Sequence, residues 1–276
     1  MKKSTQKLPV NQIVCGNCVD VMKDFPDNSI DSVITGPPYD DIRAYNGYDF
    51  DYKKVMDQLY RIIRPGGVLV WVIGDATIKG RRTLTGARQS LYADSIGFWT
   101  HDEMVWQKPS FSFPSVNRCH RVHETMYVFS KGKPTTFNKI TDRKNKSLCP
   151  FIKTPSSLTR RMKDGSIKLE PPGPNRLSYG EFGGRTSVWL MNTVSQENIG
   201  SHRNHPAQFP EALPDGHIKM WTNPGDLVLD PMCGSGTVCA IAKLNGRNYI
   251  GIDISKEYCD EARERVDNCV TKEQAA

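Results

Sequence analysis

The sequence contains no run of about 18 consecutive apolar residues, the length that a helix needs to cross a bilayer. Met1-Lys2-Lys3 imitates the basic start of a signal peptide, but residues 4–12 supply no apolar stretch to follow it. A secreted or membrane-spanning protein is therefore not expected. We predict a soluble, cytoplasmic chain with no membrane contact.

The pattern of the eight cysteines favours neither a framework of disulfides nor a zinc site. They are scattered through 276 residues, mostly inside apolar runs, which is typical of a reducing compartment. Cys15 and Cys18 have CxxC spacing, but no second CxxC follows and no histidine has ligand spacing with them. The sequence therefore predicts structural cysteines and no metal.

The net charge of +7 is unevenly distributed along the chain. Residues 131–203 contain 14 Lys and Arg and 5 Asp and Glu, a net charge of +9, which leaves −2 for the rest. The stretch Pro171-Pro172-Gly173-Pro174 would suit a solvated linker, which is the alternative interpretation. The length and charge of this segment favour a surface that binds a polyanion.

Apolar strand patterns alternate with helical patterns at both ends of the chain, and the basic segment separates the two ends. The expected strands are 30–34, 68–73, 104–106, 125–129, 226–230 and 249–252. The expected helices are 55–63, 89–96, 238–244 and 256–266. Alternation of this kind predicts a doubly wound α/β sheet.

Two polar loops follow buried strands. Thr35-Gly36-Pro37-Pro38-Tyr39 comes after strand 30–34, and residues 230–237, Asp-Pro-Met-Cys-Gly-Ser-Gly-Thr, come at the end of strand 226–230. In an open α/β sheet the carboxyl ends of the strands form the edge at which ligands bind. We therefore expect both loops at one ligand site.

The second loop has features of a nucleoside site. Gly234 and Gly236 permit a tight turn and a close approach by a ligand. Asp253 ends the next strand, 23 residues after Asp230, where an acidic side chain can accept ribose hydroxyls. The full GxGxxG pattern is absent, which argues against NAD and against a pyrophosphate. The glycines alone would suit a purely structural turn equally well, and the two aspartates favour the nucleoside.

Nearly the whole chain resembles the amino-group DNA methyltransferases, which use S-adenosylmethionine. Residues 35–39 are similar to the catalytic motif (Asp/Asn/Ser)-Pro-Pro-(Tyr/Phe), residues 230–237 to the cofactor motif, and residues 123–131 to a strand beside the base pocket. The catalytic segment precedes the basic segment and the cofactor segment comes last, which is the order of the permuted β group. Protein-glutamine methyltransferases and most RNA methyltransferases with a similar loop have the opposite order.

This resemblance implies a class I methyltransferase fold, a Rossmann-like doubly wound α/β sheet with an inserted basic target-recognition region. It divides the chain into a catalytic half at 1–130, the insert at 131–203 and a cofactor-binding half at 204–276. The implied catalytic residues are Thr35, Gly36, Pro37, Pro38, Tyr39 and Asp40. The implied cofactor-binding residues are Asn17, Cys18, His205, Pro206, Phe209, Asp230, Pro231, Met232, Gly234, Ser235, Gly236, Thr237 and Asp253. The cations expected to bind DNA are Lys139, Arg143, Lys144, Lys146, Arg160, Arg161 and Lys163.

A Pro-Pro-Tyr loop suits the chemistry of an exocyclic amine. Such an amine is conjugated into its ring and is a poor nucleophile, so hydrogen-bond acceptors must hold its protons. The carbonyl of Gly36 or Pro37 can be one acceptor, and Tyr39 can stack on a base that has left the duplex. Transfer is then a direct displacement in which positioning supplies most of the catalysis. The sequence has no Pro-Cys dipeptide of the kind that ring-carbon methyltransferases use.

Three positions depart from the family pattern. Gly36 stands where a side-chain acceptor is usual, and Asp40 or Asp41 is a candidate to replace it. Asn17 ends the segment that resembles the one near the adenine of the cofactor, where Asp is common. Phe209 stands at the lysine of a segment usually written His-Pro-Thr-Gln-Lys-Pro, which residues 205–210 resemble. The Thr-Gly-Pro-Pro-Tyr form favours cytosine N4 as the target, with adenine N6 as the alternative. A DNA-binding protein that keeps the cofactor but has lost turnover is the rival from another class, and an RNA methyltransferase is a weaker one.

The expected partner is double-stranded DNA, in the setting of restriction and modification. The sequence leaves open whether a cognate restriction endonuclease accompanies the chain and whether the protein is a monomer or a homodimer.

Overall fold

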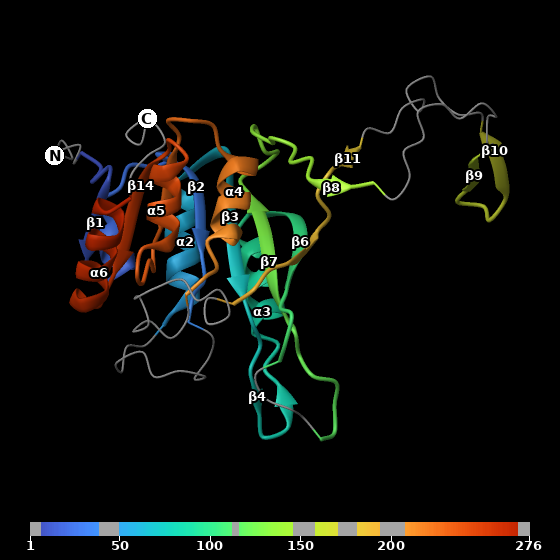
Figure 1. Ribbon diagram of the computed structural model, residues 1–276, viewed down its shortest axis with the longest axis horizontal. Coiled ribbons are helices and arrows are strands. Elements are labelled where there is room, and N and C mark those ends of the chain that lie inside the picture. The colour runs from blue at the N-terminus through green and yellow to red at the C-terminus, as the bar shows by residue number, and fades with distance from the viewer. Residues whose placement is uncertain are drawn as a thin grey trace. The chain divides into compact units, whose positions relative to one another are not determined.

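The computed structural model describes residues 7–38, 50–111, 116–145, 158–170, 181–193 and 208–269. The chain divides into two compact units, one formed by residues 1–138 with 187–276 and the other by residues 139–186. The catalytic and cofactor motifs are far apart in the sequence and come together in the larger unit (Figure 1). The smaller unit lies within the basic segment 131–203.

A mixed eight-stranded sheet forms the centre of the larger unit, in the order β1-β14-β13-β2-β3-β7-β6-β12. Its strands are β1 (Gln12–Cys15), β2 (Ile30–Thr35), β3 (Ile63–Ile73), β6 (Trp99–Gln107), β7 (His123–Ser130), β12 (Val188–Leu190), β13 (Leu227–Asp230) and β14 (Asn248–Asp253). The first five strands in this order run parallel, β7 is antiparallel to both of its neighbours, and β12 is parallel to β6.

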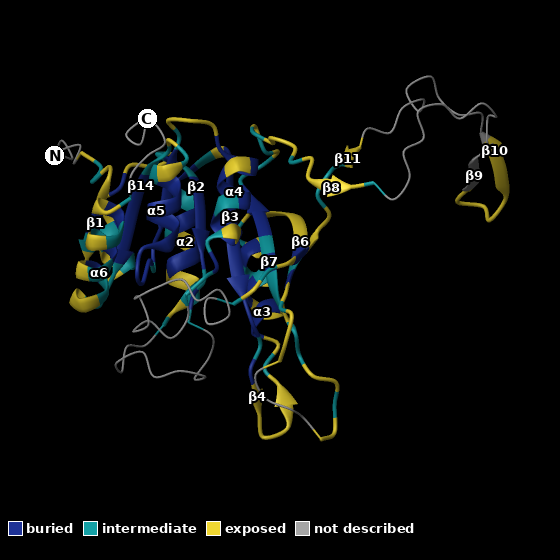
Figure 2. Cartoon of the chain, in the orientation of Figure 1, coloured by how far each residue is buried: buried dark blue, intermediate teal, exposed yellow. Residues whose placement is uncertain are grey.

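The doubly wound arrangement expected from the sequence is confirmed. The helices are α1 (Cys18–Lys23), α2 (Tyr52–Ile62), α3 (Thr85–Ser95), α4 (Ala212–Trp221), α5 (Thr237–Leu244) and α6 (Lys256–Asp267). Alternate residues of β3, such as Leu69 and Trp71, join a core cluster with α2 and α3. Val70 and Val72 point to the other face and are also buried. This part of the strand is therefore covered on both faces, which explains the continuous apolar run at residues 68–73 (Figure 2).

The boundary between α2 and β3 differs from the sequence prediction. Pro65-Gly66-Gly67 suggested a break between a helix and a strand, but β3 begins earlier, at Ile63. The pairing of β2 with β3 shifts register between Ile30 and Ser32, so the glycines lie within an irregular part of the strand. A Cβ on Gly67 would lie 2.7 Å from the carbonyl oxygen of Asp31, so this position needs glycine.

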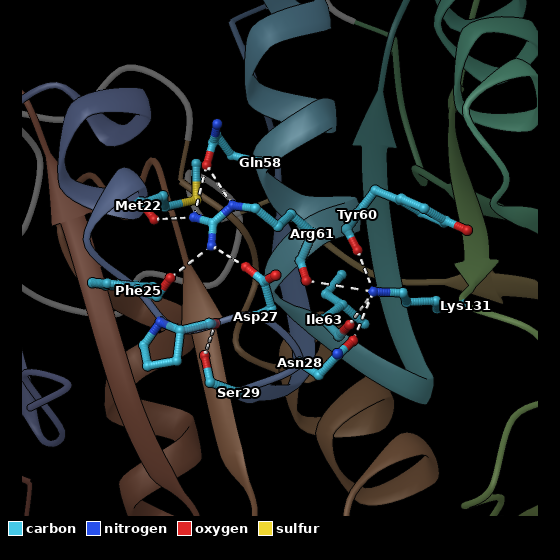
Figure 3. A network of polar contacts seen from close by, with 11 residues as sticks. Met22, Phe25, Asp27, Asn28, Ser29, Gln58, Tyr60, Arg61, Ile63 and Lys131 are labelled. Carbon is cyan, nitrogen blue, oxygen red and sulfur yellow. Dashed lines mark hydrogen bonds and ion pairs between the residues drawn. The ribbon is translucent and has the colours of Figure 1, made fainter. Parts of the chain in front are cut away.

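Arg61, near the end of α2, binds the last turn of α1 and the segment that follows it (Figure 3). Its guanidinium donates hydrogen bonds to the carbonyls of Met22 at 2.6 Å and Phe25 at 2.7 Å, and it forms an ion pair with Asp27 at 2.6 Å. The side-chain oxygen of Gln58, one turn earlier on α2, accepts a further bond at 2.8 Å. Arg61 thus joins α2 to the chain that leads into β2.

Lys131 binds the carboxyl end of the same helix (Figure 3). Its ammonium group donates to the carbonyls of Tyr60 at 2.7 Å and Ile63 at 3.0 Å and to the side-chain oxygen of Asn28 at 2.8 Å. Burial lowers the pKa of Lys131. These carbonyls lie where a helix leaves acceptors without partners, so Lys131 acts as a cap. The charge count placed it in the basic insert, but its charge serves the fold of the larger unit.

In its described residues the smaller unit has two antiparallel strand pairs. They join β8 (Arg143–Lys144) to β11 (Phe182–Gly183) and β9 (Leu158–Arg161) to β10 (Ile167–Glu170). Arg185 forms an ion pair with Asp142, and Arg143 donates to the carbonyl of Gly184 at 3.1 Å. Some cations of this unit therefore hold its own strands together.

No helix in the described part of the chain combines the length and the apolar character that crossing a membrane requires.

Candidate functional site

The catalytic and cofactor motifs meet at the boundary between β2 and β13. These strands are parallel neighbours, with Val228 opposite Ser32, so they end at the same edge of the sheet. The hydroxyl of Thr35 donates a hydrogen bond of 2.8 Å to Oδ1 of Asp230, and both side chains are buried. One buried hydrogen bond thus joins two motifs that lie 195 residues apart in sequence.

Asp230 organises the cofactor loop from inside the protein. Its Oδ1 also accepts the backbone N–H of Met232 at 3.2 Å. Burial raises the pKa of Asp230 to about 7, and the negative charge of Asp253 raises it further, while the bonds from Thr35 and Met232 oppose the shift. The carboxyl of Asp230 therefore titrates near neutral pH.

Asp253 ends β14, directly opposite Cys15 of β1. Its Oδ2 accepts the N–H of Gly234 at 2.8 Å and its Oδ1 accepts the N–H of Ser255 at 2.9 Å. Burial raises its pKa. Each carboxylate oxygen has a second lone pair, so a carboxylate held in this way can still accept two vicinal hydroxyls. The arrangement leaves free acceptors of the kind that a ribose needs, and binding of a ribose by Asp253 stays a prediction.

The two glycines of the loop have left-handed backbones, with φ of 48° at Gly234 and 77° at Gly236. The sequence suggested that both make room for a ligand. At Gly236, however, a Cβ would lie 2.8 Å from the Cβ of Ala262 in α6. The missing side chain at this position allows α6 to pack against the start of α5, which is a structural reason in addition to the backbone conformation.

The rest of the loop is also engaged with the fold. Pro231 and Ser235 are buried and Met232 is partly buried. The hydroxyl of Thr237 accepts a hydrogen bond of 2.8 Å from Arg265, whose guanidinium also forms an ion pair with Glu211 at 2.8 Å. No local pattern in the sequence connects these three residues, because they lie on three separate elements.

The segment after β1 has a structural role as well. The side-chain oxygen of Asn17 accepts the N–H of Val19 at 2.9 Å and that of Asp20 at 3.4 Å, which makes Asn17 the N-cap of α1. Burial raises the pKa of Cys18 to about 11, so its side chain remains a thiol. The N–H of Gly16 donates to the carbonyl of Asp253 at 2.8 Å, which places this segment beside the proposed ribose site.

Two of the departures from the family pattern contact each other. A Cβ on Gly36 would lie 2.3 Å from Cζ and 2.9 Å from Cε1 of Phe209. The aromatic ring therefore occupies the space that a side chain at position 36 would need. Pro37, next in the motif, is buried and Pro38 is partly buried. Read separately, the glycine and the phenylalanine are unrelated exceptions, but the structure makes them one packed pair.

Not all predicted site residues belong to the described part of the chain. Tyr39, Asp40, His205, Pro206 and Lys146 lie outside the described residues. The side chain of Arg160 is likewise not described. The other predicted DNA-binding residues lie in the smaller unit with exposed side chains; they are Lys139, Arg143, Lys144, Arg161 and Lys163.

Across the described ranges, no group of three or more His, Cys, Asp or Glu side chains is placed to hold a metal ion.

Known proteins match both the sequence and the fold. A family model described as DNA methylase, of the N6/N4 class, matches residues 30–264. The orphan methyltransferase M.BamHII of Bacillus amyloliquefaciens is 46% identical over 246 residues, which cover 88% of this chain and 91% of that protein. The type II methyltransferase M.BglII of Bacillus subtilis is 28% identical over 271 residues, 94% of this chain and 69% of that protein.

Solved structures agree with the fold. The PvuII DNA methyltransferase (cytosine-N4-specific) has a TM-score of 0.66 at 21% identity, over 99% of this chain and 92% of that chain. The M1.HpyAVI–SAM complex has a TM-score of 0.61 at 23% identity, over 92% of this chain and 98% of that chain.

The sheet, the joined motifs and the matching structures define a class I methyltransferase fold. The chain belongs to the N6/N4 family of DNA methylases, enzymes that take the methyl group from S-adenosylmethionine. The predicted family, fold and class of enzyme are thereby confirmed.

Proposed function

We propose that this chain transfers a methyl group from S-adenosylmethionine to the exocyclic amine of a flipped base in duplex DNA, and that the base is cytosine, methylated at N4. The observation that carries the proposal is the buried bond between Thr35 and Asp230, at 2.8 Å. It fixes the start of the Pro-Pro-Tyr loop against the start of the cofactor loop. A transferase needs this, because donor and acceptor must meet in one orientation.

The residues that would hold the donor lie at the ends of β13 and β14. Asp253 would accept the two ribose hydroxyls, since two backbone N–H groups already orient its carboxylate. Asp230 would support the loop from beneath, and Met232 would cover the nucleoside. When bound, S-adenosylmethionine supplies an electrophilic methyl group on a sulfonium.

The residues that would hold the base follow β2. The carbonyls of Gly36 and Pro37 would accept the protons of the amine, and Tyr39 would stack on the flipped ring. Thr35 is fully buried and bonded to Asp230, so it positions the loop and does not contact the base. The small residue at position 36, where adenine-specific members have Asp, supports cytosine N4. The PvuII enzyme carries that specificity in its name, but at 21% identity the likeness bears on the fold alone.

The exposed cations of the basic segment support duplex DNA as the substrate. We assign target recognition to residues 131–203, the catalytic half to 1–130 and the cofactor half to 204–276. The cytoplasm, which holds genomic DNA, would be the place of action. The relatives differ on a partner enzyme, since M.BamHII is named an orphan and M.BglII a type II methyltransferase.

Methyl transfer from labelled S-adenosylmethionine to duplex DNA, followed by digestion to nucleosides, tests the proposal. N4-methylcytosine is the expected product. N6-methyladenine alone would overturn the choice of base and leave the mechanism intact. Methylation of RNA but not of DNA would identify the chain as an RNA methyltransferase. Binding of DNA and cofactor with no transfer to any DNA would identify a disabled methyltransferase.

The donor site has its own test in Asp253→Ala. We expect this variant to bind S-adenosylmethionine more weakly by about 1–3 kcal/mol, because the ribose hydroxyls lose buried acceptors. Calorimetry measures the dissociation constant. The matched control is Asp260→Ala on α6, whose exposed carboxylate pairs with Lys256 at 2.7 Å. Equal affinity in the two variants would remove Asp253 from the site.

A further inference from the structure

A second concentration of positive charge lies outside the segment that the sequence marked as basic. Residues 75–88 and 108–123 contain seven Lys and Arg and one Asp, a net charge of +6, although the whole chain outside 131–203 has a net charge of −2. The net charge summed over all residues outside 131–203 therefore does not show this local positive charge. Both stretches belong to the larger unit.

Part of this charge lies on a short hairpin that leaves the sheet after β3. The hairpin pairs β4 (Thr77–Ile78) with β5 (Arg81–Arg82), and its exposed strands extend away from the sheet (Figure 2). Both turn residues are left-handed, with φ of 48° at Lys79 and 75° at Gly80, as a two-residue type I′ turn requires. Lysine is a strained choice at the first of these positions, where Asn or Gly would be usual. Strained backbones of this kind cluster at active sites and ligand-binding sites.

A neighbouring loop braces the hairpin with two arginines. Arg118 donates to the carbonyl of Gly80 at 3.0 Å, and Arg121 donates to the carbonyl of Asp75. Residues 75–84 and 116–122 thus form one feature, which we call the basic arm. Its cations are held close together, although they come from two separate parts of the chain.

The acidic side chain of the arm does not neutralise these cations. The carboxylate of Asp75 accepts the N–H of Gly86 at 3.0 Å, at the start of α3. Lys79, Arg81 and Arg82 are exposed, and no ion pair in the described part of the chain involves them. Their charge therefore faces solvent and is available to an anionic partner.

The basic arm leaves the sheet beside the catalytic motif. β3 is parallel to β2, with Trp71 opposite Thr35, so the chain after Ile73 and the chain after Thr35 emerge at the same edge. β7 starts there as well, because Thr125 is opposite Ile73. A duplex whose base reaches the Pro37 loop would therefore pass close to the arm.

We propose that the basic arm is a second DNA-binding surface, whose cations contact backbone phosphates next to the target base. This inference rests on the proposed function for the identity of the polyanion. The arm contributes affinity and positions the duplex over the catalytic loop. Recognition of sequence is left to the insert, because phosphate contacts carry no base information.

The triple variant Lys79→Gln, Arg81→Gln, Arg82→Gln tests the proposal. If the three cations meet phosphates, the slope of log affinity against log salt should decrease by about 2–3, and affinity at about 150 mM salt should fall on the order of a hundredfold. Fluorescence anisotropy with a labelled duplex measures both quantities. Calorimetry with S-adenosylmethionine should show an unchanged dissociation constant, which establishes that the variant is folded.

The matched control is Lys7→Gln, Lys23→Gln, Lys219→Gln. These three exposed lysines precede β1, end α1 and end α4, at the opposite edge of the sheet from the arm. We expect the control to bind DNA as the wild type does. Equal slopes in the two triple variants would overturn the proposal. It would also be overturned if the arm variant lost affinity for RNA but bound duplex DNA as the wild type does. If the triple variant is unstable, Arg81→Gln alone should lower the slope by about 1, and no change would again overturn it.

The outcomes separate this proposal from the proposed function. If the wild type methylates DNA and the arm variant binds DNA as tightly as the wild type, only the proposal that the arm binds DNA is refuted. DNA binding through the arm by a wild type that methylates no DNA would refute the catalytic function alone.

Discussion

At the scale of single residues, the contact between Gly36 and Phe209 changes what a serine at position 36 is expected to do. A Cβ there would lie 2.3 Å from the ring, so the ring must move to admit it. We expect Gly36→Ser to destabilise the protein by about 1–3 kcal/mol, the usual cost of overpacking. Denaturant unfolding measures this change.

The control is the double variant Gly36→Ser, Phe209→Ala, in which the ring is gone. The two substitutions should be strongly non-additive, with a coupling of about 1 kcal/mol or more. Methyl transfer by the double variant then shows whether the serine hydroxyl assists the amine. Additive effects would mean that the ring and position 36 do not share one space.

The buried carboxyl of Asp230 should make stability depend on pH. Its pKa is raised to about 7 in the folded protein, so between pH 4 and 7 the folded state binds more protons than the unfolded state. The contribution to stability is complete below about pH 4 and is lost as the pH rises through about 7. A shift of this size corresponds to on the order of 4 kcal/mol.

Asp230→Asn should abolish this dependence, because the amide oxygen can still accept from Thr35 but cannot titrate. Urea unfolding of both proteins at pH 5 and pH 8 provides the comparison. The wild type should lose more stability than the variant between these two pH values. Parallel behaviour would show that Asp230 is ionised throughout.

At the scale of elements, Lys131 belongs to the segment that the sequence predicts to bind DNA, but its charge stabilises the end of α2. Lys131→Met should destabilise the protein by about 1–3 kcal/mol, because the carbonyls of Tyr60 and Ile63 lose their donor. Lys133→Met, two residues later and exposed, should change stability by less than about 0.5 kcal/mol. Chemical denaturation compares the two, and equal losses would contradict the capping role.

At the scale of the whole molecule, the charge of the insert should govern the salt dependence of DNA binding. If about 6 of its cations meet phosphates, affinity should fall roughly a thousandfold between about 50 and 200 mM salt. Lys139→Gln, Lys144→Gln, Lys163→Gln should reduce the slope, whereas Arg185→Gln should mainly loosen the smaller unit, because Arg185 pairs with Asp142. DNA binding that does not depend on salt concentration would favour the interpretation of residues 131–203 as a solvated linker.

Much of the fold could be predicted because its signals are local. Apolar runs mark β2, β3, β13 and β14, and glycine and proline mark the loops at their ends. β1 and β12 carried no comparable signal, since they are short and lie at the edges of the sheet. β4 and β5 have two residues each, too few for any alternation to show.

The sequence by itself determined the family and the order of the two motifs, and it predicts the carboxylate for the ribose, because each depends on residue types at fixed spacing. Only the tertiary structure decided what these residues touch. It joined Thr35 to Asp230, filled the space above Gly36 with Phe209 and turned Lys131 toward a helix end. It also gathered the cations of the basic arm from two stretches of chain. Such contacts join residues far apart in sequence, so no local pattern records them.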